Sequence, residues 1–106
     1  MDIWDFFDRR RREIERYSVA IERFDDRAFL SVRERVAFVG GRFHIAKYSY
    51  YLVIDGAELW GFDKAPDHEV VVHGHVGPAH ERVESPELAL SEVVERAWTT
   101  LSSYYE

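Results

Sequence analysis

Two glycine-containing dipeptides constrain the fold of this chain more than any other feature. Gly40-Gly41 lies between two runs in which apolar and polar residues alternate, and Asp55-Gly56 lies between the second run and a third. A two-residue hairpin turn needs positive φ at its central positions, which glycine adopts readily and aspartate tolerates. The pattern therefore predicts three consecutive antiparallel strands joined by tight turns.

The flanking segments predict helices, so the expected fold class is α+β. We expect an N-terminal helix, an antiparallel β-meander of four to five strands and a C-terminal helix packed on the sheet. Within a single domain over residues 1–106, the expected elements are an N-terminal helix at 1–17, the antiparallel sheet at 18–73, a histidine-containing loop at 74–84 and the C-terminal helix at 85–104.

The helix boundaries rest on local signals. Asp2 is a favourable N-cap for the first helix, and Ser85 followed by Pro86 is typical of the start of the last one. From Ser18 the apolar period changes to two, which predicts a strand there. The alternative is a first helix that continues to residue 24, because four apolar residues also fit a helical period: Ile14, Tyr17, Ile21 and Phe24.

Composition excludes several classes of protein. With 46% hydrophobic residues, the 106-residue chain is too apolar to be disordered. The absence of cysteine excludes disulfides, thiolate zinc ligands and cysteine nucleophiles. No apolar run reaches the roughly 18 residues of a membrane span and the N-terminus lacks a signal-peptide pattern, so we expect a cytoplasmic protein without membrane contact. The net charge of −6 counts against long-range attraction to nucleic acid.

Glu34 interrupts an apolar strand face. It lies between Val32 and Val36 in the alternation, where a carboxylate is costly unless it is paired, hydrogen-bonded or protonated. One interpretation is an ion pair with Arg42 or Lys47 of the neighbouring strand, and another is an edge strand whose face is wet. The third is a catalytic carboxylate in a cleft.

Four of the five histidines fall within 13 residues, beside two aspartates. Imidazole exchanges protons near neutral pH, so this cluster suits acid–base cleavage of a phosphodiester. A divalent metal site and loop histidines bonded to backbone carbonyls are the alternatives. The spacing matches no standard zinc motif, and we expect neither a metal nor another cofactor. With Glu34, the candidate catalytic residues are Asp63, His68, His73 and His75.

Basic and aromatic residues of the same region are candidates for contact with a nucleic acid. Bases can stack on the tyrosines of the 48–51 run, Tyr50 above all, beside Arg42 and Lys47. Lys64 or Arg42 would steady the charge that develops on a phosphate during cleavage. The alternative is that the tyrosines only pack on the two faces of a strand.

Arg9-Arg10-Arg11-Arg12 is the one concentrated basic run. Nearby acidic residues can pair with it along a helix, which favours a solvated face. The alternative is a surface that contacts a phosphate or a partner. In that interpretation the candidate partner-binding residues are Arg9, Arg10 and Arg12.

Four motifs follow one another along the chain. The segment 30–34 reads Leu-Ser-Val-Arg-Glu and 47–50 reads Lys-Tyr-Ser-Tyr; the Asp55-Gly56 turn then leads to 61–68, Gly-Phe-Asp-Lys-Ala-Pro-Asp-His, and to His73-Gly74-His75. In this order, with Ser85-Pro86 before the last helix, they resemble the TumE-type toxin family of prokaryotic toxin–antitoxin pairs. The resemblance covers about residues 19–101.

The resemblance implies a small α+β toxin that is neutralised by a cognate antitoxin, often a helix-turn-helix protein. The chain departs from the family pattern at Gly61-Phe62, in place of Arg-Trp, and at Lys64 and Asp67, in place of an asparagine and a histidine. The resemblance and the chemistry of the side chains agree on a common set of positions: Glu34, Asp63, Pro66, His68, His73 and His75.

Two hypotheses of different classes follow. The first is a toxin that acts on RNA or another nucleic acid as a metal-independent ribonuclease, with a histidine exchanging protons and Glu34 orienting a histidine or acting as base. The second is a non-enzymatic module that binds a partner through the sheet edge or the arginine helix. An exposed strand edge and an aromatic-rich surface also favour a homodimer.

Overall fold

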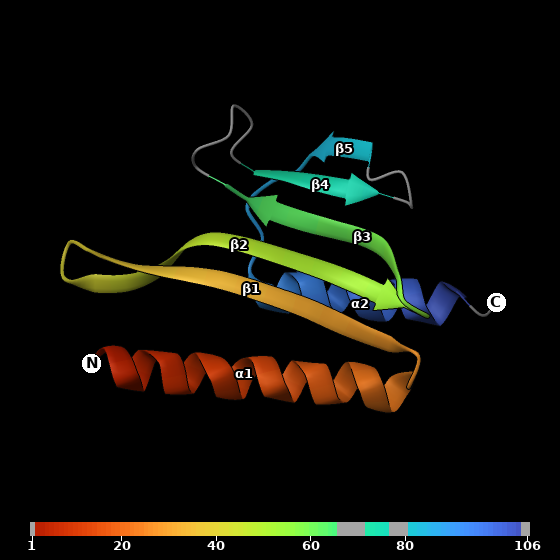
Figure 1. Cartoon of the computed structure of the whole chain (residues 1–106), viewed down its shortest axis with the longest axis horizontal. Coiled ribbons are helices and arrows are strands. Elements are labelled where there is room, and N and C mark those ends of the chain that lie inside the picture. The colour runs from red at the N-terminus through yellow and green to blue at the C-terminus, as the bar shows by residue number, and fades with distance from the viewer. Residues whose placement is uncertain (1, 66–71, 77–80, 105–106) are drawn as a thin grey trace.

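The computed structural model describes residues 2–65, 72–76 and 81–104, with the backbone alone at 72, 73, 81–84 and 104 (Figure 1). The strands form one antiparallel sheet in the order β1-β2-β3-β4-β5, and the two helices complete an α+β fold, as the sequence predicts. In chain order the elements are α1 (Ile3–Phe24), β1 (Ala28–Val39), β2 (Arg42–Ile54), β3 (Ala57–Lys64), β4 (Val72–Val76), β5 (Glu81–Glu84) and α2 (Leu90–Tyr104).

Both predicted hairpin turns are confirmed. Gly40 and Gly41 have φ of 62° and 77°, and they join β1 to β2. Asp55 and Gly56 have φ of 51° and 78°, and they join β2 to β3. Two consecutive residues of positive φ match the right-handed twist of the strands, which explains why these dipeptides start tight hairpins.

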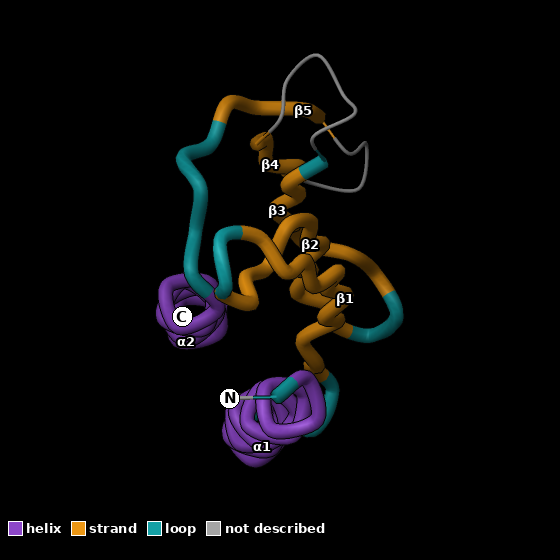
Figure 2. Tube along the Cα trace, turned by 90° about the vertical axis from the view of Figure 1, so that its left-hand side faces the viewer, coloured by secondary structure: helices purple, strands orange, loops and turns teal. Residues whose placement is uncertain are grey.

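Side chains of alternate residues divide the sheet into two faces. Both helices pack on one face, which we call the helix side, and Figure 2 shows no described helix over the other, which we call the open face. Leu30 of β1 lies opposite Leu52 of β2, and both belong to the helix side. The odd-numbered neighbours Ser31 and Tyr51, also directly opposite each other, therefore belong to the open face.

The core fills the space between the helix side and the two helices. Tyr50 is 1% exposed at its centre, and Val93 and Ala97 of α2 are fully buried over the sheet. The same core receives partly buried apolar residues from α1, Ile14 and Tyr17. The core thus forms on the helix side of the sheet, and the residues of the open face do not contribute to it.

The strand expected from residue 18 is wrong, and the alternative helix is correct. α1 continues to Phe24 because Ile21, which is fully buried, and Phe24 extend the helical stripe onto the core. The Phe24 ring lies 4.8 Å from that of Trp98 in an edge-on contact, so α2 stabilises the last turn of α1. The predicted cap is confirmed, since Asp5 N donates to Asp2 Oδ1 at 2.9 Å.

The boundaries expected at 74 and 85 are also wrong. β4 extends through residues 74–76 and β5 occupies 81–84, where a loop was expected, because β4 continues to pair with β3 beyond the apolar run and β5 pairs with β4. α2 begins at Leu90 instead of following Ser85-Pro86. Its first turn is closed by Glu92, whose Oε1 accepts from Ala89 N at 3.0 Å.

Gly61 allows an aromatic ring to lie across β3. The register places it between Tyr51 of β2 and His75 of β4, and a Cβ at residue 61 would come within 2.2 Å of Tyr51 Cδ1. Only glycine therefore accommodates the Tyr51 ring in its present position.

Gly61→Ala should destabilise the fold by about 1–3 kcal/mol, because the added methyl overlaps the Tyr51 ring and forces it to move. The measurement is the free energy of unfolding from urea denaturation. The same substitution in a Tyr51→Ala background, where the space is empty, should cost almost nothing. An equal cost in both backgrounds would show that the ring is not the cause.

Candidate functional site

The sheet separates the charged residues of its centre into two clusters, one on each face. The helix-side cluster is centred on Glu34 of β1, and the open-face cluster is centred on Asp63 of β3. Neighbouring tyrosines of β2 bind the two carboxylates: Tyr50 donates to Glu34, and Tyr51 donates to Asp63. Because successive side chains of a strand point to opposite faces, the two carboxylates cannot share one site.

Glu34 is bound by Arg10 of α1 in a two-pronged ion pair. Arg10 Nε donates to Glu34 Oε1 at 2.7 Å, and Arg10 Nη2 donates to Glu34 Oε2. Tyr50 OH donates to the same Oε2, and Arg10 Nη1 reaches Glu13 Oε2 at 3.1 Å. The Glu34 side chain is 7% exposed and that of Arg10 20%, so the pair is largely withdrawn from water.

This geometry decides among the interpretations of Glu34. The carboxylate is ion-paired, but its partner is Arg10, which is 24 residues away in sequence, and the proposed pairing with Arg42 or Lys47 is wrong. β1 is an edge strand of the sheet, but the expectation that its face at Glu34 is exposed to water is wrong, because α1 covers this part of β1. The hypothesis that Glu34 orients a histidine does not hold for His75, which lies on the open face with Asp63.

Tyr50 lies inside this cluster. Burial, and then the hydrogen bond to Glu34, raise the pKa of Tyr50 far above its usual value near 10, so the phenol keeps its proton and remains a donor. At 1% exposure its ring cannot receive a base, so the prediction that Tyr50 contacts nucleic acid is wrong. The ring instead stacks on Tyr48 at 4.5 Å between centroids.

Among the described residues, three side chains on the open face bind the Asp63 carboxylate. Ser49 Oγ donates to Oδ1, Tyr51 OH donates to Oδ2 at 2.7 Å, and His75 Nε2 lies 2.8 Å from Oδ2. The donors come from β2 and β4, the two strands that flank β3, and the ladder register brings them together. Asp63 and His75 were both predicted as site residues, and the structure places them in contact.

His75 is held in place by its neighbours. Its ring stacks on that of Tyr51 at 6.1 Å between centroids and 23° between planes, and its side chain is 15% exposed. Burial and the bond to Asp63 raise the pKa of Tyr51 well above 10, so Tyr51 remains a neutral donor. A carboxylate that engages Nε2 fixes the imidazole ring and leaves Nδ1 as the nitrogen that can exchange a proton.

The remaining predicted site residues lie in several places. His68 is outside the described residues; the backbone of His73 lies opposite Asp63 in the ladder. Lys64 belongs to the helix side and forms an ion pair with Glu87 at 2.6 Å, so it does not lie with Asp63 and His75, and its contact with a phosphate stays a prediction. Lys47 belongs to the open face, and Arg42 starts β2 beside the hairpin turn.

The arginine run of α1 divides between the core and the surface. Arg10 turns to the sheet, as described, while Arg9 and Arg12 are exposed. Arg12 pairs with Asp8 at 2.7 Å, and Arg11 pairs with the same aspartate at 2.8 Å. Sequence reasoning missed the role of Arg10. The helical period shows which face of α1 carries Arg10, but it does not show which strand residue that face contacts.

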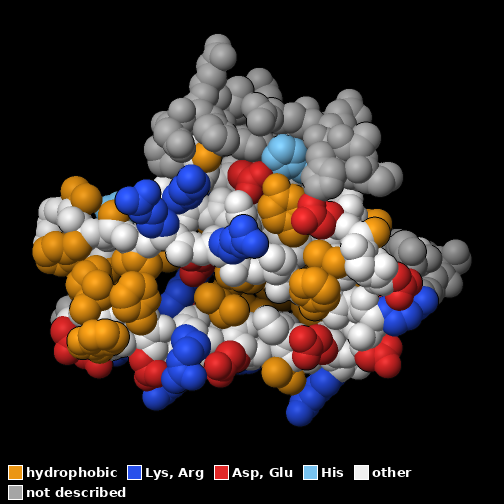
Figure 3. Space-filling view, in the orientation of Figure 1, with side chains coloured by type: hydrophobic (Ala, Val, Ile, Leu, Met, Phe, Trp, Pro, Cys, Tyr) orange, Lys and Arg blue, Asp and Glu red, His pale blue; other side chains and the backbone are white. Residues whose placement is uncertain are grey.

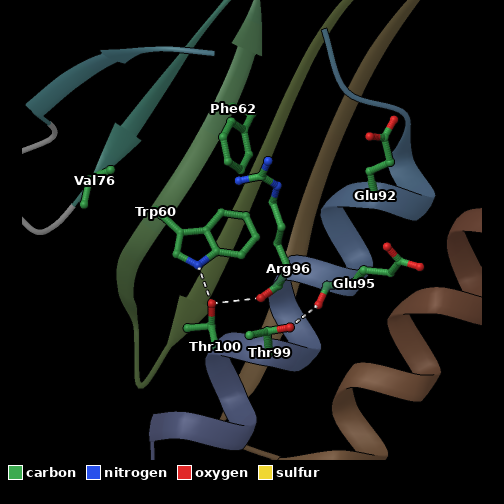
Figure 4. Close-up of a pocket in the computed structure, with 8 residues that line it drawn as sticks. All are labelled: Trp60, Phe62, Val76, Glu92, Glu95, Arg96, Thr99 and Thr100. Carbon is green, nitrogen blue, oxygen red and sulfur yellow. Dashed lines mark hydrogen bonds between the residues drawn. The ribbon is translucent and has the colours of Figure 1, made fainter. Parts of the chain in front are cut away.

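A separate cavity of about 630 Å³ lies between α2 and the helix side of β3 and β4 (Figure 4). Trp60 Nε1 donates to Thr100 Oγ1 at 3.0 Å, and the Arg96 guanidinium lies 5.3 Å from the Phe62 ring centroid. Glu92 and Glu95 line the same cavity. Trp60 and Thr100 bind each other and Arg96 lies over the Phe62 ring, so the described lining of this cavity offers mainly aromatic surface.

Neither a metal site nor a membrane span is formed by the part of the chain that the structure describes. Within that part no three side chains of histidine, aspartate or glutamate gather closely enough to hold a metal ion. Neither described helix combines the length and the apolarity that crossing a bilayer requires.

Fold and site together define a small α+β protein whose sheet carries an aspartate–histidine pair on the face that the helices leave open. A protein-family model described as Toxin TumE matches residues 2–103. The chain belongs to this toxin family, which makes it similar to the toxin component of a toxin–antitoxin pair and implies an antitoxin partner. A search of curated proteins returned no match, and neither did a search of solved structures.

Arg10→Leu should destabilise the protein by about 3–5 kcal/mol, because it leaves the buried Glu34 carboxylate without its cation. The double variant Arg10→Leu/Glu34→Gln should recover most of that loss, since the amide is neutral and still accepts from Tyr50. Denaturation in urea measures both. The control is Arg11→Leu, an exposed arginine of the same helix, which should leave the midpoint nearly unchanged; equal losses for the two arginines would contradict the assignment.

Stability should fall as the pH rises above about 10. The pKa of Tyr50 is raised in the folded state, so below pH 10 both states keep the phenol proton, and above it only the unfolded chain releases it. Tyr50→Phe should therefore lower stability at pH 8 but weaken the alkaline loss. Urea midpoints at pH 8, 9.5 and 11 test this, and unchanged alkaline slopes in the variant would refute it.

Proposed function

We propose that this protein is a cytoplasmic toxin that cleaves RNA without a metal ion, through an acid–base site formed by Asp63 and His75. The observation that carries the proposal is the contact of His75 Nε2 with Asp63 Oδ2 at 2.8 Å on the open face. An aspartate that orients an imidazole is a recurrent arrangement for proton transfer. The pair lies on the face of the sheet that no described helix covers (Figure 2), where an extended nucleic acid strand could reach it.

The reaction follows from this pair of side chains. His75 removes the proton of a ribose 2′-hydroxyl, the resulting oxygen attacks the adjacent phosphorus, and the bond from phosphorus to the 5′-oxygen breaks. The departing 5′-oxygen takes a proton from an acid, and the products are a 2′,3′-cyclic phosphate and a 5′-hydroxyl. His73 and His68, the other predicted catalytic residues, are the candidates for that acid, since one protonated imidazole would complement one neutral imidazole.

Tyr51 and Ser49 serve this site as positioning residues. Both bind the Asp63 carboxylate, so they set the direction in which it holds His75. The stacked Tyr51 ring limits rotation of the imidazole. A fixed ring favours proton transfer, because catalysis falls steeply when a group is misplaced by an ångström.

A second candidate function, a non-enzymatic binding module, is favoured by exposed apolar residues at the N-terminal end of α1 and at the tip of the β1–β2 hairpin. Trp4 is 78% exposed, Phe38 61% and Val39 64%. Such a patch is typical of a protein contact, either with the antitoxin, for which a helix-turn-helix protein is the expected class, or within a homodimer. Arg9 and Arg12 would border that contact.

His75→Ala and Asp63→Asn should each relieve the growth arrest that expression of the wild-type protein causes, with in vitro cleavage slowed about 10²–10⁴-fold. Co-expression of the neighbouring antitoxin should rescue the wild type. His44→Ala is the matched control, since His44 is an exposed histidine of β2, roughly 16 Å along the strand from Ser49, and it should arrest growth as the wild type does.

Circular dichroism and thermal unfolding show whether each variant is folded. A folded His75→Ala protein that arrests growth at wild-type strength would remove the histidine from the mechanism. If Arg9→Glu/Arg12→Glu then abolished the arrest, the binding module would replace the ribonuclease as the best account.

A further inference from the structure

Three basic residues lie together on the open face, and one of them, Arg35, belongs to no motif of the sequence. Arg35 of β1 is directly opposite Lys47 of β2, and Arg33 of β1 is directly opposite Ser49. Because residues two apart on a strand share a face, Arg33, Arg35 and Lys47 all project from the face that carries Asp63 and His75. Figure 3 shows basic side chains gathered over β1 and β2 on this face, near a histidine and acidic side chains.

This arrangement is unfavourable for the isolated protein. Like charges directly opposite each other on neighbouring strands destabilise a sheet, and Arg35 and Lys47 form such a pair. None of the three cations makes an ion pair or hydrogen bond within the part of the chain that the structure describes. Other exposed cations, such as Arg11 and Arg12, have acidic partners on their own helix. Within the described residues the group is therefore uncompensated, and an anionic ligand would compensate it.

The basic group and the Asp63–His75 site form one continuous surface. Arg33, Ser49 and Asp63 occupy a single row across three strands, and Tyr51 and His75 occupy the next row. The register shift after Arg35 adds twist at the end of the basic group. A ligand that reaches from Arg35 to His75 would thus follow the open face without crossing an element of the fold.

We propose that Arg33, Arg35 and Lys47 bind consecutive phosphates of a single-stranded RNA and deliver its backbone to Asp63 and His75. This inference rests on the proposed function and names the substrate class, single-stranded RNA, and the residues that hold it. Arg33 and Arg35 are about 6.7 Å apart along β1, a spacing close to one nucleotide of an extended strand. Exposed Phe29, on the same face of β1, supplies a ring on which a base can stack.

A basic patch also suits an acidic protein segment, but two observations favour RNA. The cations lie beside a proton-transfer pair, which a protein partner would not use, and aromatic rings accompany them on the same face. The net charge of −6 means that binding depends on this local group, with little help from long-range attraction.

The test is binding of a 5′-fluorescein-labelled 2′-O-methyl oligouridine of 12 nucleotides, followed by fluorescence anisotropy between 25 and 200 mM NaCl. The methyl groups prevent cleavage through a 2′-hydroxyl. Three phosphate contacts give a slope of log K against log salt of about −2, at about −0.7 for each contact. Arg33→Gln/Arg35→Gln should bring the slope to about −0.7 and weaken binding at 25 mM NaCl at least tenfold.

Arg11→Gln/Arg23→Gln is the matched control, because it removes the same charge from two exposed arginines on α1, and it should bind as the wild type does. The inference is overturned if the wild type does not bind at 25 mM NaCl, if the β1 variant binds unchanged, or if the α1 variant loses as much affinity. It is also overturned if the β1 variant keeps RNA affinity but loses the antitoxin, since the surface would then contact a protein.

The growth assay separates this inference from the proposed function. If His75→Ala relieves arrest while the β1 variant binds RNA normally, the ribonuclease stands and the phosphate assignment fails. If the β1 variant loses RNA binding while folded His75→Ala still arrests growth, the binding surface stands and the catalytic proposal fails.

Discussion

The ion pair between Glu34 and Arg10 is the constraint on which the rest of the architecture depends. A carboxylate on the covered face of β1 must be neutralised, and the nearest strands offer it only the Tyr50 hydroxyl. Arg10 meets this need from α1, which must therefore lie along β1 with that face of the helix inward. The pair costs desolvation, but it favours the docking in which the face of α1 that carries Arg10 lies against β1. The apolar contacts of Ile14, Tyr17 and Ile21 then follow from the same orientation.

Docking of both helices on one face leaves the open face without a described helix. On the helix side, the polar groups of the aromatic residues form hydrogen bonds within the fold. Tyr50 donates to Glu34, Tyr48 OH accepts from Leu88 N at 3.0 Å, and Trp60 donates to Thr100. On the open face, the same strands present the bonded Asp63–His75 pair, and they also present three cations that have no partner among the described residues. Because side chains alternate along β2, Tyr50 joins the helix-side cluster and Tyr51 joins the open-face cluster, although the two residues are adjacent and chemically identical.

Sequence reasoning succeeded where the signal was local. The turns at Gly40-Gly41 and Asp55-Gly56 were predictable because positive φ restricts the residue type. Asp63 and His75 were selected because histidines cluster beside aspartates in that part of the sequence, and their role in a site stays a prediction. Sequence reasoning failed where a distant partner decides the outcome. α1 continues past residue 18 because Trp98 and the sheet receive its last turns, and Arg10 could not be assigned to Glu34 because no pattern links residues 24 apart. The four-to-five-strand meander was predicted, but the length of β4 depends on its pairing with β3, and that of β5 on its pairing with β4, rather than on their own composition.

The sequence by itself determined the class of this protein: an antiparallel meander flanked by helices, without cysteine, bearing the motifs of a toxin family whose model matches residues 2–103. These properties depend on backbone conformation at the turns, on alternation along strands and on residue type, all of which act over a few neighbouring positions. Only the tertiary structure decided which face each charged residue occupies in relation to the others. That choice depends on strand register and on where α1 docks, which together separate Glu34 from His75 and place Arg33, Arg35 and Lys47 beside the Asp63–His75 pair.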